Sequence, residues 1–136
     1  MVYQNSIFVG NVGDSRAYLF NGQLMWQMTE DHSLVYEQLK MSKFRNINED
    51  QLLGKNIITR SVGFEPSIQV DILQKKIVPG DCIFICSDGV TGMVTDEQLL
   101  EVFSSTEGEQ IPQKCIELAC LGGGDDNISA LYIKFS

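Results

Sequence analysis

The stretch Pro79-Gly-Asp-Cys-Ile-Phe-Ile-Cys-Ser-Asp88-Gly89 joins a turn, a strand and a candidate ligand without a break. Pro79 and Gly80 suit the two central positions of a type II turn, because the second of these needs a positive φ. Residues 82–86 are all apolar, which is typical of a strand buried on both faces. Asp88 follows directly, at a strand end where carboxylates from distant segments can converge.

The remaining segments predict an α+β fold with antiparallel sheets, since most strands precede two helices and one strand follows them. Asn21-Gly22 predicts a type I′ turn joining hairpin arms at 16–20 and 23–27. Thr95 and Gln98 form a capping box before a helix at about 96–104. Further expected elements are strands at 7–9, 57–60, 68–72 and 128–135 (with Leu131, Ile133 and Phe135 facing inward), helices over 33–41 and from about 112 to Gly122, and one helical turn at 49–53 begun by Asn48 and Gln51.

Composition narrows the class of protein. The chain has 136 residues, 43% of them apolar, and a net charge of −8. An acidic chain without clustered Lys and Arg argues against nucleic acid or an anionic membrane as a partner. The charge alone fits binding of cations or basic peptides as well as it fits a plain solvated surface. No apolar run approaches the roughly eighteen residues of a membrane span, and no signal peptide precedes the first strand, so we expect a cytoplasmic protein.

The four cysteines, at positions 82, 86, 115 and 120, lack the spacing of a zinc site. We interpret all four as reduced core residues. The single histidine, His32, is either an acid/base group or, more simply, a helix-entry residue bonded to Asp31. No Gly-x-Ser-x-Gly motif is present, and one histidine offers little to a serine or cysteine nucleophile.

Three aspartates, Asp14, Asp88 and Asp126, each lie just past or just before a predicted strand. Hard cations such as Mg²⁺ and Mn²⁺ prefer oxygen ligands of this kind. Asp-Ser, Asp-Gly and Asp-Asn are also common turn pairs, so each aspartate taken singly fits a structural role. The residues alone therefore leave an oxygen-ligand metal site as a possibility.

Five motifs in order carry the argument further. They are Gly10-Asn-Val-Gly-Asp14-Ser-Arg-Ala-Tyr-Leu19, Thr29-Glu-Asp-His-Ser-Leu-Val35, Ile58-Thr-Arg-Ser-Val-Gly63, Pro79 to Gly89, and Gly123-Gly-Asp-Asp-Asn127-Ile-Ser129. Together they resemble the carboxy-terminal part of the metal-dependent protein serine/threonine phosphatases, type 2C, and are most similar to the compact bacterial members. Each motif alone is weak, and the order and spacing of all five make the resemblance specific.

The resemblance implies a four-layer αββα sandwich, of which residues 1–136 would be an incomplete, carboxy-terminal part. It also implies two core Mn²⁺ or Mg²⁺ ions, with a third in many members, and a bridging water that attacks phosphoserine or phosphothreonine. Asp88 and Asp126 correspond to core-metal ligands, and Asp14 to a ligand of the third metal. Gly89 and Asn127 would support them. The insertion at about 36–60, with Tyr36, Arg45 and Arg60, corresponds to the flap beside the active site.

The chain departs from the family because the amino-terminal acidic and Asp-Gly motifs that hold both core metals have no match. We therefore expect part of a hydrolase that is inactive alone and is completed by a missing amino-terminal half, or that self-associates. Two alternatives remain open: a catalytically dead module that binds or regulates partners, and an unrelated acidic α+β domain whose motifs are only turns.

Overall fold

The computed structural model describes residues 1–22, 24–42, 54 and 57–136, and within them two antiparallel sheets. The smaller sheet has the strand order β1-β2-β5 and the larger has the order β4-β3-β6-β7. The bounds are β1 (Val2–Tyr3), β2 (Ser6–Asn11), β3 (Arg16–Asn21), β4 (Leu24–Gln27), β5 (Asp71–Lys76), β6 (Cys82–Cys86) and β7 (Ala130–Lys134).

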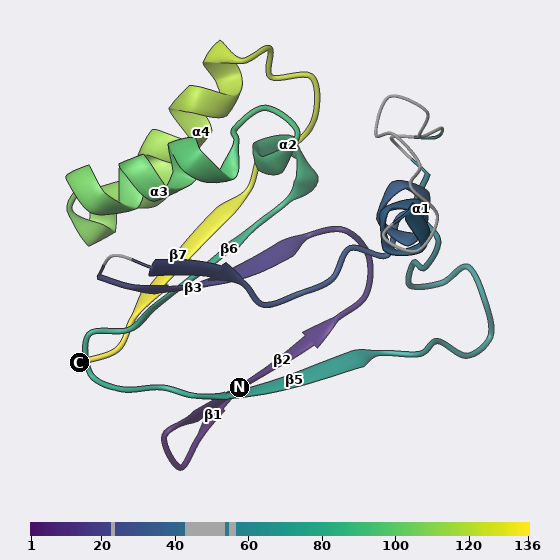
Figure 1. The fold of residues 1–136 in the computed structure, drawn as a ribbon, viewed down its shortest axis with the longest axis horizontal. Helices are drawn as coiled ribbons and strands as arrows, with labels where there is room; N and C mark the ends of the chain where they lie inside the picture. The colour runs from purple at the N-terminus through teal and green to yellow at the C-terminus, as the bar shows by residue number, and fades with distance from the viewer. Residues whose placement is uncertain (23, 43–53, 55–56) are drawn as a thin grey trace.

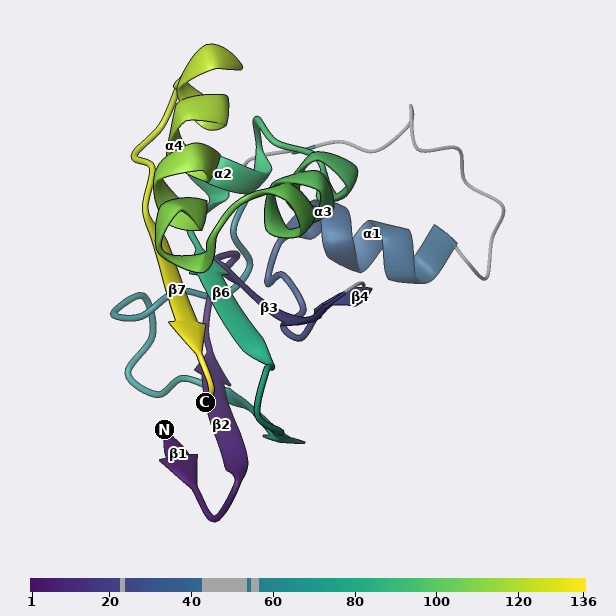
Figure 2. The ribbon, with the colours of Figure 1, turned by 90° about the vertical axis from the view of Figure 1, so that its left-hand side faces the viewer.

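The helices gather on the outer face of the larger sheet. They are α2 (Asp88–Thr91), α3 (Asp96–Ser105), the short 3-10 helix η2 (Gly108–Gln110) and α4 (Ile111–Leu121). Figure 1 shows them above β6 and β7, with the smaller sheet below, and Figure 2 shows α3 and α4 lying across the larger sheet. Helix α1 (Leu34–Ser42) lies to one side, at the exit from the β3–β4 hairpin. The order is helices, sheet, sheet, which confirms an antiparallel sandwich of the expected kind, one helical layer short.

Strand β6 is the centre of the molecule because its two faces serve two different cores. Phe84 and Cys86 point to the helical layer, where Phe84 meets the ring of Phe103 edge-on at 5.2 Å between centroids. Ile83 and Ile85 point to the smaller sheet and pack with Ile7 and Leu19. The wholly apolar run is therefore a strand packed on both faces, as predicted, since four of its five residues are buried and Ile85 is partly buried.

Local chemistry set several elements as expected. Gly80 has φ +98° and the Asp81 N–H donates to the Val78 carbonyl oxygen, which makes the predicted turn before β6. The Thr95 hydroxyl accepts from the Gln98 N–H while the Gln98 side chain accepts from the Thr95 N–H, so the capping box of α3 is confirmed. The expected turn at 49–53 lies outside the described residues.

The hairpin turn is displaced by one residue from its predicted place. Asn21 is the last residue of β3 and pairs with Leu24, so it belongs to the strand, and Gly22, with φ +62°, begins the turn. The Asn21 side chain donates to the Asp81 carboxylate at 2.6 Å instead. An unpredicted hairpin joins β1 to β2, and its central residues Gln4 and Asn5 carry the two positive φ values that a type I′ turn requires.

Two strand assignments were wrong. Residues 57–60 make only an isolated bridge, between Ser33 and Ile58, and the side chain of Arg60 contacts His32, just before α1, and Asp71 of β5. The strand expected at 68–72 begins at Asp71 and runs to Lys76, as the partner of β2. The alternation of apolar and polar residues at 68–72 predicted the wrong strand bounds, because residues 68–70 lie in the loop that leads into β5.

Some burial expectations also need correction. Cys120 is exposed, whereas the other three cysteines are buried and unpaired as expected. Ile133 and Phe135 pack against the core between the sheets, but Leu131 on the same side of β7 is 52% exposed because no described element covers it. None of the described helices is both long enough and apolar enough to cross a membrane.

Candidate metal centre

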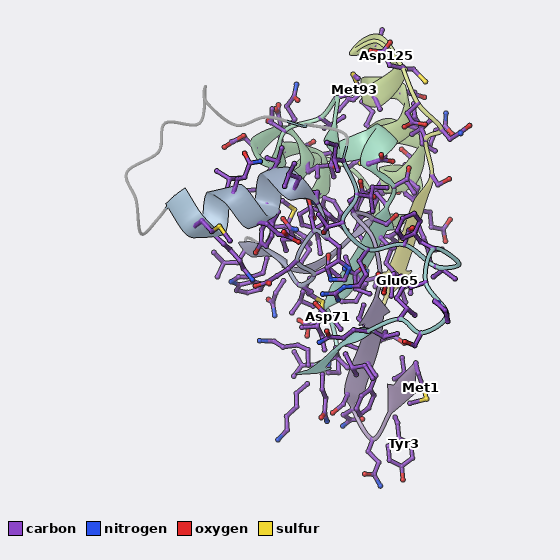
Figure 3. All side chains as sticks on the ribbon, turned by 90° about the vertical axis from the view of Figure 1, so that its right-hand side faces the viewer. Met1, Tyr3, Glu65, Asp71, Met93 and Asp125 are labelled. Carbon is purple, nitrogen blue, oxygen red and sulfur yellow. The ribbon has the colours of Figure 1, made fainter. Side chains whose placement is uncertain are left out.

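Carboxylates from four separate segments line one cavity of about 510 Å³ at an end of the molecule. They come from the β2–β3 loop, from the loop after β4, from the start of α2 and from the loop before β7, and they are Asp14, Asp31, Asp88, Asp125 and Asp126. The three predicted aspartates thus border the same cavity, although their roles remain a prediction. In Figure 3, the labelled Met93 and Asp125 of this cavity lie at the opposite end of the molecule from Met1 and Tyr3.

The local fold places each aspartate by a different device. Asp88 opens the short helix α2 directly after buried β6, and its carboxylate accepts from the Gly89 N–H at 3.0 Å. Asp126 forms a similar turn, accepting from the Asn127 N–H at 2.6 Å. These self-contained Asp turns are the structural role foreseen for the residues taken singly, and they leave other carboxylate oxygen positions open toward the cavity.

The loops of Asp88 and Asp126 are held together by hydrogen bonds of the Ser87 side chain to the backbone before β7. The Ser87 hydroxyl donates to the Asn127 carbonyl oxygen at 3.0 Å and accepts from the Ser129 N–H at 3.0 Å. Gly89 is buried so closely against this loop that a Cβ on it would lie 2.4 Å from the Asn127 carbonyl oxygen. The two predicted supporting residues, Gly89 and Asn127, are therefore in direct contact.

We expect Gly89→Ala to lower stability by about 1–3 kcal/mol, because a methyl group at this point must push two backbone segments apart. Gly10→Ala is the matched control, since a Cβ on Gly10 meets only the Val70 side chain at an ordinary 3.5 Å. Urea unfolding followed by tryptophan fluorescence measures both. Equal midpoints for the two variants would contradict the close contact.

The electrostatics of the cavity favour a cation. Burial raises the pKa of Asp14 above its ordinary value, and the nearby negative charge of Asp88 raises it further. Neighbouring carboxylates that each disfavour the charge of the other are stabilised when a positive charge enters between them. The donors are all carboxylate oxygens, which suits Mg²⁺ or Mn²⁺ better than a softer metal.

Few of the described side chains at this cavity could bind a metal ion. Over residues 1–22, 24–42, 54 and 57–136, no three His, Cys, Asp or Glu side chains lie close enough together to hold a metal ion by themselves. A hard cation that keeps several waters can be held by one or two carboxylates. The residues therefore fit a partly hydrated cation whose remaining ligands come from elsewhere.

Sequence reasoning missed an ion pair at the cavity wall. Arg16 makes a bidentate contact to Asp31, with Nε and Nη2 donating to the carboxylate at 2.7–3.1 Å. Nη1 of the same guanidinium lies 3.3 Å from the Tyr18 hydroxyl, which in turn donates to Asp96 at the start of α3. These contacts occupy Arg16 and leave it little freedom to capture a ligand. The one sequence signal for this ion pair is the position of Arg16, two residues after Asp14.

His32 does not bond Asp31 as expected. Its buried ring lies between Gly13, whose N–H donates to Nδ1 at 3.0 Å, and Asp71 of β5, whose carboxylate is 3.0 Å from Nε2. Asp31 bonds Arg16 instead, so the two neighbours point to different partners. His32 is not among the residues that line this cavity.

Known proteins match this chain over nearly its whole length. No family model matches it. It is 35% identical over 134 residues to the serine/threonine phosphatase Stp of Listeria innocua, covering 96% of this chain and 52% of that protein. The solved Stp1 of Staphylococcus aureus superposes with a TM-score of 0.86 at 27% identity, over 99% of this chain and 54% of the other. The catalytic domain of the phosphatase PstP, solved with 2 manganese ions, superposes with a TM-score of 0.80 at 28% identity, over 100% and 56% of the two chains.

Over nearly its whole length the chain matches the carboxy-terminal part of the type 2C serine/threonine phosphatases. The resemblance drawn from the five motifs is thereby confirmed, and the chain corresponds to the carboxy-terminal part of the bacterial members. It spans about half the length of the curated relatives that it matches. The αββα sandwich of the type 2C phosphatases is accordingly present in part.

The residues assigned to the type 2C flap are only partly visible. Tyr36 lies in α1, with the Lys40 ammonium 5.2 Å from its ring centroid. Arg45 lies outside the described residues. Arg60 contacts Asp71 and the Gln69 carbonyl oxygen, so it is anchored to the smaller sheet, outside the cavity lining.

Proposed function

We propose that this chain supplies the carboxy-terminal part of a catalytic domain that removes phosphate from phosphoserine and phosphothreonine in proteins. The observation that carries the proposal is the meeting of Asp14, Asp88 and Asp126 at one cavity, in a chain related to serine/threonine phosphatases. Carboxylates at a solvent-reached cavity edge suit metal-assisted hydrolysis of a phosphate ester.

In this proposal Asp88 and Asp126 hold core divalent cations, either Mn²⁺ or Mg²⁺, and Asp14 serves a third, looser one. The manganese ions of the PstP catalytic domain support a divalent metal here. Such ions, when bound, lower the pKa of a coordinated water and offset the charge that develops on the phosphoryl oxygens. Asn127 and Gly89 contribute by holding the Asp88 and Asp126 loops in register.

The described side chains leave the phosphate without a positive partner from this chain. Arg16 is the cationic side chain at the cavity wall within the described part of the chain, and Asp31 already neutralises it. A phosphoryl group at this cavity therefore needs cations or donors from outside these residues. This agrees with a site completed by an amino-terminal half that brings further metal ligands.

A second function is a phosphatase-like module that binds partners without catalysis. The small donor set favours it, because no three metal-binding side chains cluster in the part of the chain that the structure describes. The two functions differ in one respect that can be measured, namely whether the natural polypeptide that contains this chain turns over a phosphate ester.

We expect the 136 residues alone to give no measurable hydrolysis of p-nitrophenyl phosphate with millimolar Mn²⁺, because two core ligands do not fix an attacking water. The natural polypeptide with its amino-terminal half should hydrolyse both this ester and a phosphothreonine peptide, and EDTA should stop it. Turnover by the 136 residues that is lost in Asp88→Asn would mean that the site is complete within them. A full-length polypeptide that is inactive with either metal would favour the binding module.

A further inference from the structure

Two neighbouring residues hold both ends of the segment that carries Asp14. The His32 N–H donates to the Gly13 carbonyl oxygen at 2.9 Å, and the Gly13 N–H donates back to the His32 ring at 3.0 Å. On the other side of Asp14, the guanidinium of Arg16 is clamped by Asp31. Asp14 itself thus sits on a short bridge between two anchored points.

The His32 contacts define its tautomer. Nδ1 accepts from the Gly13 N–H, so the ring proton is on Nε2, which donates to Asp71 Oδ2 at 3.0 Å. Asp71 Oδ1 accepts from Arg60 Nη1 at 2.8 Å. The 3.0 Å approach of Arg60 Nη1 to His32 Nε2 is then a contact between two donors that share one carboxylate.

The ring is buried and has no freedom to choose other partners. Only 6% of the residue is exposed, and both ring nitrogens are engaged. Hydrogen bonds from His32 and then from Arg60 lower the pKa of Asp71, so this carboxylate stays ionised and keeps its hold on the ring. The line of contacts runs from the smaller sheet, through the ring, to the loop at the cavity.

We propose that His32 is a positioning residue: its Nδ1 fixes the Gly13 N–H and thereby the backbone from which Asp14 reaches the cation. This rests on the proposed function of Asp14 as a ligand. A positive φ of +107° at Gly13 makes the turn sensitive to such a restraint, because glycine has many other conformations to adopt. A simpler packing role for His32 would not require an acceptor at the Nδ1 position.

Two substitutions separate these roles. In His32→Asn the amide oxygen can occupy the place of Nδ1, since both atoms are bonded to Cγ, and the Gly13 contact is retained. In His32→Gln the polar atoms move one bond further out, near the place of Nε2, so the Asp71 contact is retained and the Gly13 contact is lost. The first readout is hydrogen exchange of the Gly13 amide, measured by NMR in the natural full-length polypeptide.

We expect His32→Gln to speed Gly13 exchange about tenfold, the equivalent of one lost hydrogen bond, and His32→Asn to stay near wild type. Asp71→Ala, at a side chain that is 36% exposed, should also speed exchange because the ring loses its orienting partner. Asp71→Ala is the variant to measure if His32→Gln fails to fold. Unchanged Gly13 exchange in either His32→Gln or Asp71→Ala would overturn the positioning role.

The second readout is the Mn²⁺ concentration that broadens the Asp14 amide signal by half. Loss of a positioning partner commonly weakens metal binding about 10–100-fold, and we expect a shift of that size for His32→Gln but not for His32→Asn. Equal Mn²⁺ responses in all variants would overturn the proposal. Absence of any Mn²⁺ response in the wild type would instead overturn the proposed function, and Gly13 exchange, which involves no metal, tells the two failures apart.

Discussion

Asp88→Ala and Asp126→Ala each nearly abolish phosphatase activity in the natural full-length polypeptide, by an expected factor of about 10³ or more, comparable to the loss of a main electrostatic stabiliser. Both side chains border the cavity from loops that are locked to each other, so neither can replace the other. We expect a smaller effect for Asp14→Ala, because in the proposed function Asp14 serves the more loosely held cation. Steady-state hydrolysis of a phosphothreonine peptide at several Mn²⁺ concentrations measures all three.

The matched control is Glu101→Ala, an exposed carboxylate on α3 that is absent from the cavity lining. It should keep wild-type activity. Thermal melts with and without metal decide between a ligand and a turn role. Replacing an aspartate that acts as a ligand removes the rise in melting temperature that metal causes, with only the small metal-free loss expected from its turn hydrogen bond. A loss of folding that is equal and severe in all three would support aspartates that only build turns.

We expect the 136 residues alone to form oligomers rather than a monomer of 15.2 kDa. The described helices cover the larger sheet only, and on the outer face of the smaller sheet Ile72 of β5 is 74% exposed. A few hundred Å² of uncovered apolar surface represents roughly several kcal/mol, against a typical net stability of about 5–15 kcal/mol. Strand β5 also has a described neighbour, β2, on one side only, and such edges recruit other strands.

Light scattering coupled to gel filtration measures the mass directly. Ile72→Lys should shift the population toward monomer, because a charge at this point opposes both burial and strand pairing. Leu121→Lys is the matched control, since Leu121 is equally exposed, at 84%, but lies at the end of α4. A wild-type monomer with a cooperative melt would refute the expectation. In the full-length polypeptide we expect the amino-terminal half to cover this face.

The parts of the fold that could be predicted are those determined by residues close together in the sequence. The turn at Gly80, the apolar run of β6 and the capping box at Thr95 each depend on chemistry within a few positions, and each was confirmed. The hairpin slipped by one residue because Asn21 had a distant partner, Asp81, that outweighed its turn preference. A turn dipeptide cannot reveal a contact that another strand supplies.

The candidate site divides in the same way. Asp14, Asp88 and Asp126 were found because their motifs lie beside strand ends, and the folded chain brings all three to one cavity. Asp125 and Arg16 were missed: the first stands next to an equally plausible aspartate, and the second is explained only by Asp31 across the hairpin. Arg60 was assigned to the flap, but it contacts Asp71. The sequence could not predict this contact, because only the fold brings the two segments together.

The strand registers carry a consequence for how fast the chain can fold. Ser6 pairs with Lys76 and Arg16 with Cys86, so in both sheets the central partners are separated by about half the chain. Among the described elements, the β1–β2 and β3–β4 hairpins and the α3–α4 pair can form from nearby residues. Long-range pairing must first close a large loop, and such topologies fold slowly, in roughly milliseconds to seconds. A nascent chain therefore spends that interval with β6, its most apolar strand, unpaired, which makes synthesis at low temperature and low concentration the favourable regime for obtaining it intact.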